Sequence, residues 1–162
     1  MREQAPSGIG FNTPVTVLLV SPMAEDHTSL TAVFDRVEKI PGANSEFILR
    51  PCASVEAATA AMSQARIPIV VTERDLPGAS WRDILDRALL LPGSPVLIVT
   101  SRLADEYLWA EALNLGAYDV LAKPFDAQEV IRVIGSAWRH WTDLHRRIEA
   151  RNLQPMVAMT AA

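Results

Sequence analysis

The sequence predicts an α/β fold, in which a doubly wound parallel sheet of five strands carries helices on both faces. Short apolar runs rich in Val, Ile and Leu alternate five times with segments of helical periodicity. The connections between them are short, which suits right-handed strand–helix–strand units. The 162 residues fit one domain, which we place at residues 14–140, and no internal repeat competes with this interpretation.

The first unit follows directly from local composition. Residues 15–20 (VTVLLV) form a continuous β-branched run between Pro14 and Ser21, which favours a buried strand over a helix. Apolar residues at helical spacing then predict a helix over about residues 24–40, and Pro41 ends it.

The second and third strands flank an alanine-rich helix. A strand is predicted at residues 46–50, and Ser54 caps a helix over residues 55–64. The apolar run at residues 67–72 predicts a buried central strand. Glu73 is then the first side chain beyond the strand, at the carboxyl edge of the sheet where open α/β folds collect ligand chemistry.

The helix after the third strand begins at Ser80 and runs to Leu90, with Asp83 in position for a capping box. Pro95 then precedes a continuous apolar strand at residues 96–100. These two elements complete the centre of the predicted sheet.

The last two helices are also marked by their ends. Acidic residues open a helix over about residues 105–115, and Gly116 ends it. A fifth strand is predicted at residues 118–122, and Asp126 begins the final helix. Residues 1–13 are interpreted as a flexible leader.

The final helix is predicted to outrun the sheet. Its apolar spacing continues to residue 151, so we expect residues 141–151 to project as an extension of the helix. Residues 152–162 are too few to bury a core of their own, and we expect them to form a mobile tail.

Charge and cysteine content exclude several classes of function. Fifteen basic and nineteen acidic residues give a net charge of −4, which disfavours binding to nucleic acid or to anionic membranes. The single cysteine, Cys52, cannot form an internal disulfide, and the three histidines are too scattered for a zinc site. No apolar run approaches the roughly 18 residues of a membrane span. We therefore expect a cytoplasmic protein.

The order of motifs resembles the receiver domain of bacterial response regulators. The elements are Leu-Pro-Gly at residues 76–78, Val-Thr-Ser at residues 99–101, and Gly116 followed by Lys-Pro-Phe at residues 123–125. The last of these is the most specific. The resemblance covers the whole predicted domain and implies a flavodoxin-like strand order of 2-1-3-4-5.

Receiver domains transfer a phosphoryl group from a kinase histidine to their own aspartate. An acidic pair after the first strand holds Mg²⁺, a hard cation that takes oxygen ligands. The aspartate that ends the third strand is the nucleophile. A hydroxyl after the fourth strand and a lysine after the fifth stabilise the phosphoryl group, which carries about −1.5 to −2 charge.

The resemblance implies that this sequence keeps the residues that receive the phosphate. Thr100 matches the switch hydroxyl, and Lys123 matches the phosphate-binding lysine. Pro124 matches the proline that the family holds through a cis peptide bond.

The residues that carry out the chemistry are replaced. The acidic pair falls on Ser21 and Pro22, the phosphoacceptor on Glu73, and the switch aromatic on Val120. A glutamate places its carboxylate one methylene further out, and a misplacement of roughly 1 Å costs on the order of a hundredfold in such a reaction. We therefore predict a pseudo-receiver with no catalytic residues and no Mg²⁺ or other cofactor.

Three acidic residues leave alternatives open. Glu25 and Asp26 lie near the magnesium position and could substitute for the acidic pair, although acids are common in a first helical turn for dipole reasons alone. Asp75 is an alternative acceptor. Glu73 either pairs with Lys123 and imitates a charged state, or it is a solvated acid worth roughly 0 to 1 kcal/mol as an exposed ion pair.

Excess apolar surface predicts a protein partner. Receiver domains commonly dimerise through the helix at residues 105–115, the strand at residues 118–122 and the last helix, so we expect a homodimer there. The alternative is that the tryptophans of the last helix cap the core. The candidate interface residues are Tyr107, Trp109, Ile131, Trp138 and Trp141.

Three functions remain open. The first is a phosphorylation-independent module of two-component or phosphorelay signalling that acts by protein–protein interaction. The second is a working receiver that accepts phosphate from a histidine kinase or phosphotransfer protein. The third is a regulator whose nucleic-acid-binding output domain is lost or abbreviated, to which the basic segment at residues 146–151 would belong.

Overall fold

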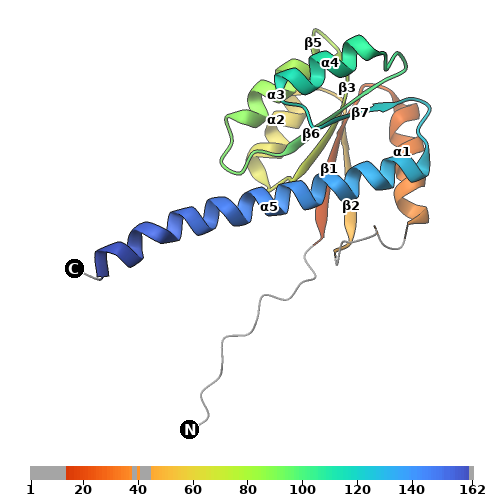
Figure 1. The fold of residues 1–162 in the computed structure, drawn as a ribbon. Helices are drawn as coiled ribbons and strands as arrows, with labels where there is room; N and C mark the ends of the chain where they lie inside the picture. The colour runs from red at the N-terminus through yellow and green to blue at the C-terminus, as the bar shows by residue number, and fades with distance from the viewer. Residues whose placement is uncertain (1–13, 38–39, 41–44, 161–162) are drawn as a thin grey trace.

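The computed structural model describes residues 14–37, 40 and 45–160. Five parallel strands form one sheet in the order β2-β1-β3-β6-β7, with helices on both faces (Figure 1). This is the predicted α/β fold with the predicted flavodoxin-like strand order. The leader at residues 1–13 and the predicted stop at Pro41 lie outside the described residues.

The first half of the chain follows the prediction closely. The helix α1 ends at Arg36, before Ile40, and β2 continues two residues past the predicted Arg50. The bounds are Val15–Val20 for β1, Ala24–Arg36 for α1, Phe47–Cys52 for β2 and Val55–Gln64 for α2.

The second half adds one feature that the sequence analysis missed. Two short strands, β4 and β5, form a hairpin around Pro77 and Gly78, and Gly78 has the left-handed φ of 64° that favours glycine. The bounds are Ile69–Glu73 for β3, Asp75–Leu76 for β4, Ala79–Ser80 for β5, Trp81–Leu89 for α3, Val96–Ser101 for β6, Glu106–Leu115 for α4, Asp119–Ala122 for β7 and Ala127–Thr160 for α5.

The helix ends are fixed by the predicted caps. Ser54 accepts a hydrogen bond from the backbone of Ala57, and Ser80 and Asp83 form a complete capping box. Gly116 closes α4 at a φ of 110°, which suits its lack of a side chain.

Alternate residues of the strands enter two hydrophobic cores. Leu18 and Val20 of β1 pack with α2, α3 and α4, whereas Val17 and Leu19 pack with α1 and α5. A strand that is buried on both faces must be apolar throughout, which explains the continuous apolar runs in the sequence.

The last helix differs from the prediction in two ways. The prediction ends it at Arg151, but α5 continues to Thr160 and so occupies most of the predicted tail. The prediction also has the helix projecting from residue 141, but Trp141 and His145 are buried against the body. From Arg146 to Gln154 every residue is exposed. Figure 1 shows this end of α5 running beyond the sheet.

No helix of the described residues is both long enough and apolar enough to cross a membrane.

The packing of α5 on the sheet gives the first testable prediction. Ile134 is fully buried in the core between α1 and α5, whereas Leu153 is 64% exposed on the same helix. We expect Ile134→Ala to lower the free energy of unfolding by about 2–5 kcal/mol through lost burial and a cavity. The matched control Leu153→Ala should change it by less than about 0.5 kcal/mol. Urea unfolding measures both, and equal effects would contradict this packing.

Candidate functional site

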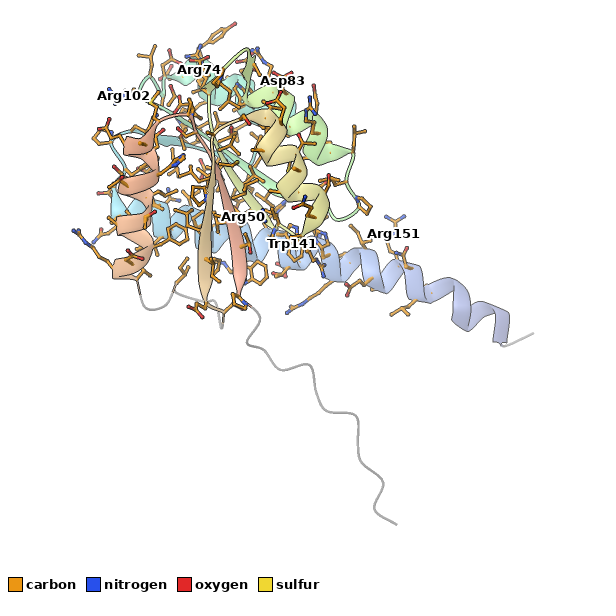
Figure 2. All side chains as sticks on the ribbon, turned by 180° about the vertical axis from the view of Figure 1, so that it is seen from behind. Arg50, Arg74, Asp83, Arg102, Trp141 and Arg151 are labelled. Carbon is orange, nitrogen blue, oxygen red and sulfur yellow. The ribbon has the colours of Figure 1, made fainter. Side chains whose placement is uncertain are left out.

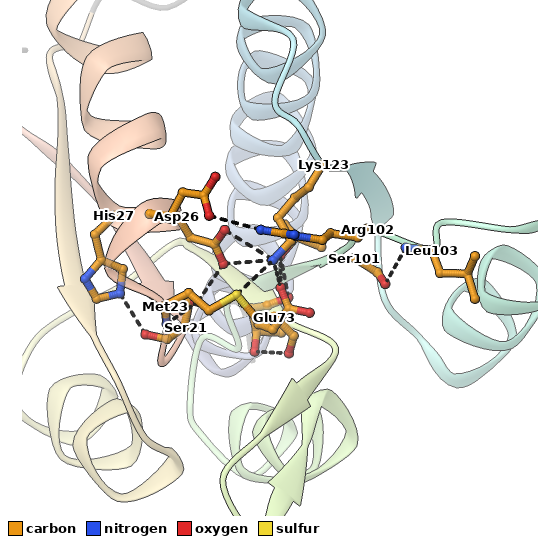
Figure 3. A network of polar contacts seen from close by, with 12 residues as sticks. Ser21, Met23, Asp26, His27, Glu73, Ser101, Arg102, Leu103 and Lys123 are labelled. Atoms are coloured by element: carbon orange, nitrogen blue, oxygen red, sulfur yellow. Dashed lines mark hydrogen bonds and ion pairs between the residues drawn. The ribbon is translucent and has the colours of Figure 1, made fainter.

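The candidate site lies at the carboxyl edge of the sheet, where four parallel strands end. Val20 of β1 pairs with Thr72 of β3, and Glu73 pairs with Thr100 of β6. Lys123 follows β7 at the same edge. The register therefore brings together Ser21, Glu73, Thr100 and Lys123. Figure 3 shows Ser21, Glu73 and Lys123 close to one another at this edge.

Lys123 is the centre of this site. Its ammonium group donates to Asp26 Oδ2 at 2.9 Å and Oδ1 at 3.2 Å, and it also contacts Glu73 Oε2 (Figure 3). The side chains of Lys123, Asp26 and Glu73 are only 4%, 5% and 6% exposed. One buried cation is thus shared by two buried carboxylates, which we call the Lys123 cluster.

Asp26 is the residue whose role the sequence analysis underestimated. It comes from the first turn of α1, yet it is buried and turned toward Lys123. Ser21 Oγ donates to Asp26 Oδ2 at 2.6 Å, and Ser21 Oγ accepts from the backbone N–H of Met23 at 3.1 Å. Ser21, at the first position of the family's acidic pair, therefore orients the carboxylate of Asp26, five residues later in the sequence.

The other proposed acids do not join the cluster. Glu25 pairs with Arg102 at 3.0 Å on the surface, where both side chains are mostly exposed. Asp75 is exposed in β4. Pro22 is also exposed, and it has no N–H to donate.

The predicted switch positions take up core roles. Thr100 is fully buried, and its hydroxyl lies 3.4 Å from both Glu73 Oε2 and the Thr72 carbonyl, at the long limit of a hydrogen bond. Val120 is buried in the core that α4 covers. The neighbouring Tyr118 is bonded to Ser136 of α5 through its hydroxyl. The peptide bond between Lys123 and Pro124 is cis, as the resemblance implies.

The charges of the Lys123 cluster decide which interpretation of Glu73 holds. Glu73 is buried and contacts Lys123, so it is not the solvated acid of the second interpretation. Burial by itself lowers the pKa of Lys123, but the hydrogen bonds that it donates to Glu73 and then to Asp26 outweigh burial and raise the pKa above its usual range. The ammonium group is therefore held firmly in its charged form.

The candidate interface residues fall into three groups by exposure. Tyr107 of α4 is 78% exposed. Trp109, Ile131 and Trp138 are half-buried against the two cores, and Trp138 packs edge-on to Phe47. Trp141 is buried, stacked between Trp138 and His145, with the Arg66 guanidinium over its ring. The alternative that the tryptophans cover the core thus holds for Trp141, which offers no free surface.

Removing the central cation should destabilise the fold. Lys123→Met leaves two carboxylates buried side by side, and we expect the free energy of unfolding to fall by about 3–5 kcal/mol. Arg102→Met, which breaks the exposed pair with Glu25, should cost less than about 1 kcal/mol. Urea unfolding near neutral pH compares them, and similar losses would show that the Lys123 cluster is not a buried, paired unit.

The pH dependence of this loss has a definite sign. Because the pKa of Lys123 is raised in the folded protein, its stabilisation is complete below the unfolded-chain pKa of about 10.4 and is lost as the pH rises through the folded value. The difference in unfolding free energy between wild type and Lys123→Met should therefore be constant from about pH 7 to 9 and shrink above about pH 10.4. A difference that grows at alkaline pH would contradict the raised pKa.

Comparisons with known proteins identify solved structures that share this fold. No protein-family model matches the chain, and no curated protein matches it in sequence. Solved structures do match. The signal receiver domain of an HD domain-containing protein from Pseudomonas fluorescens Pf-5 is 22% identical, with a TM-score of 0.70 over 82% of this chain and 93% of that one. A putative response regulator from Chloroflexus aurantiacus is 24% identical, with a TM-score of 0.65 over 77% and 98%.

A third match is the receiver domain of a sensor histidine kinase from Pseudomonas aeruginosa PAO1. It is 18% identical, with a TM-score of 0.62 over 75% of this chain and 94% of that one, and its active-site cleft coordinates a magnesium ion. Each of the three matches covers at least 75% of this chain. The chain has the CheY-like fold of response-regulator receiver domains.

Proposed function

We propose that this chain is a receiver-fold module of two-component signalling that does not depend on phosphorylation and acts by protein–protein contact. The observation that carries the proposal is the Lys123 cluster. The lysine that would bind an incoming phosphate already holds two carboxylates of its own chain, Asp26 and Glu73. The ammonium group that would stabilise an incoming phosphate is therefore already paired with carboxylates of its own chain.

The charge in the cluster supports this interpretation. Two carboxylates supply a formal charge of −2, which is close to the −1.5 to −2 of a protein-bound phosphoryl group at neutral pH. Lys123 thus has the kind of electrostatic partner that a phosphorylated receiver would give it. We propose that the fold is held permanently in a state that imitates phosphorylation.

The residues at the carboxyl edge do not fit the family's magnesium ion. Mg²⁺ is usually held by one or two carboxylates together with waters and phosphate oxygens. Here the two available carboxylates both bond the Lys123 ammonium, which would repel a divalent cation beside it. Within the described ranges, no group of three or more His, Cys, Asp or Glu residues is arranged to hold a metal ion.

Alignment of the nucleophile also argues against phosphoryl transfer. Glu73 Oε2 is directed at Lys123 and lies within reach of the Thr100 hydroxyl. The reaction depends on in-line positioning of the attacking oxygen. A carboxylate that is one methylene longer and bonded to an ammonium group lacks the freedom to take that position.

The partner is proposed to be a protein. The solved neighbours include receiver domains of response regulators and of a sensor histidine kinase, which supports a place in two-component signalling. A histidine kinase, a phosphotransfer protein or a second copy would meet the face formed by α4, β7 and α5. Of the candidate interface residues, Tyr107 is the one that stands fully exposed there.

A working receiver remains the second candidate, because Asp26 brings a carboxylate to the site. If Lys123 left Glu73 when phosphate arrived, Asp26 and Glu73 would provide a metal ligand and an acceptor. This candidate requires that the contacts of the Lys123 cluster break during each turnover.

Intact mass spectrometry separates the two candidates. After incubation with acetyl phosphate and Mg²⁺, we expect no gain of a phosphoryl group on the wild-type chain. The variant Ser21→Asp, Pro22→Asp, Glu73→Asp rebuilds the family's acidic positions, and we expect it to gain one phosphoryl group only when Mg²⁺ is present.

The outcome that would overturn the proposal is equally clear. A stoichiometric, magnesium-dependent gain on the wild-type chain that disappears in Glu73→Gln would establish a working receiver. A gain on the rebuilt variant alone would locate the loss of activity in the three substituted positions.

A further inference from the structure

The amino edge of the sheet, opposite the Lys123 cluster, carries an open groove that the proposed function does not use. Its volume is about 520 Å³. The walls come from the end of α2, the connection between α3 and β6, and the second half of α5. Residues that line it include Met62, Arg66, Leu91, Pro92, Ile148 and Glu149. We call it the amino-edge groove.

The groove is apolar, with one charge of each sign. Arg66 comes from the connection between α2 and β3, and Glu149 comes from α5. The Arg66 guanidinium lies over the Trp141 ring, 4.6 Å from its centroid. Within the part of the chain that the structure describes, neither Arg66 nor Glu149 is in an ion pair. The groove therefore offers two unpaired, opposite charges.

Beside the groove, α5 leaves the body of the domain without support. Figure 2 shows Trp141 where the helix passes beneath the sheet, and Arg151 further along, beyond the body. Leu144 and Ile148 continue the core-facing stripe of α5, yet they are 43% and 44% exposed. Helices shorter than about 12 to 15 residues are marginal in water without packing.

A buried imidazole at the groove also lacks a partner. His145 lines the groove, and its Nδ1–H donates to the Trp141 carbonyl at 2.8 Å. Its Nε2 is buried without a hydrogen-bond partner among the described residues. A buried nitrogen left without a hydrogen bond is costly, so contact with a group that can bond it would stabilise this part of the surface.

We infer that a second copy of the chain fills the amino-edge groove with its own α5, as a two-fold symmetric dimer. Each copy places Leu144 and Ile148 against the groove of the other. Glu149 of each copy forms an ion pair with Arg66 of the other, so the dimer contains two such ion pairs. A surface that is its own complement is what a two-fold interface requires.

The charges also set the direction of the two helices. Arg66 lies over Trp141 of its own copy. Glu149 of one copy can therefore reach Arg66 of the other only if it lies beside residue 141 of that other copy. In a parallel pair, residue 149 would lie beside its own equivalent instead. The two α5 helices are therefore antiparallel. This interface is separate from the α4 face, and it does not depend on whether the carboxyl edge accepts phosphate.

The first test is the oligomeric state of the full chain, measured by sedimentation equilibrium over a concentration series. We expect a dimer for the wild type. Ile148→Glu puts a charge in the apolar centre of the contact in both copies, and should raise the dissociation constant by about a hundredfold or more. Leu103→Glu is the matched control, because Leu103 is 65% exposed after β6 at the opposite edge of the sheet, and it should leave the dissociation constant unchanged.

The second test is an exchange of charges between two variants. Glu149→Arg alone brings two arginines together across the interface, and Arg66→Glu alone brings two glutamates together, so each variant should be monomeric. When the two variants are mixed, each of the two contacts joins an arginine to a glutamate, with the charges exchanged at one of them. We therefore expect a heterodimer. Circular dichroism of each variant shows that it is folded before mixing.

Several results would overturn the inference. A wild-type chain that stays monomeric at every concentration would do so, as would folded variants that fail to pair when mixed. A dimer that survives Ile148→Glu but is lost in Tyr107→Glu would also overturn it, while leaving the proposed function and its α4 face in place.

Discussion

The buried ammonium group of Lys123 is the main electrostatic constraint on this structure. A buried cation is stable only when buried anions neutralise it and its hydrogen bonds are made. Asp26 arrives from α1, Glu73 from β3 and Lys123 from the end of β7, so one cluster joins three separate parts of the chain. The arrangement of the carboxyl edge follows from that requirement.

We propose that the same cluster closes the carboxyl edge to phosphoryl transfer. In the family that the sequence resembles, an aspartate accepts the phosphoryl group, Mg²⁺ is bound beside it, and a lysine stabilises the new charge. In this chain the charge is built in, and Ser21 holds Asp26 in place to supply part of it. The amino edge is different, because its groove carries unpaired charges and α5 runs on beyond the body. The proposed contacts with other molecules therefore lie on faces other than the family's reaction site.

Much of the fold could be read from local sequence, because the signals are local. Continuous apolar runs predict strands buried on both faces, and Ser54, Ser80 and Gly116 fix helix ends through their own backbone contacts. The site was harder to predict. An acid in a first helical turn normally serves the helix dipole, so Asp26 was considered only as a possible substitute for the acidic pair. Its spacing of four and seven residues from the buried Leu30 and Val33 is the signal that places it on the inner face.

The sequence left open whether Trp141 covers the core or faces a partner, and it did so for a different reason. Its packing depends on Arg66, which is far away in the sequence and is brought beneath α5 only by the completed sheet. Helical periodicity describes one face of one helix and carries no information about what that face meets. The hairpin of β4 and β5 is similar, since a Pro-Gly turn predicts a reversal but not that two flanking residues on each side will pair.

The measurement that tests the closed carboxyl edge most directly is an amide NMR titration of the full chain with Mg²⁺, and then with Mg²⁺ and beryllium fluoride, which imitates a phosphoryl group on a carboxylate. If Asp26 and Glu73 are held by Lys123, the resonances of Ser21, Glu73, Thr100 and Lys123 will not move beyond the general effect of added salt. Saturable shifts of these four residues would show that the site still accepts a metal ion and a phosphoryl group, and would contradict a cluster closed from within.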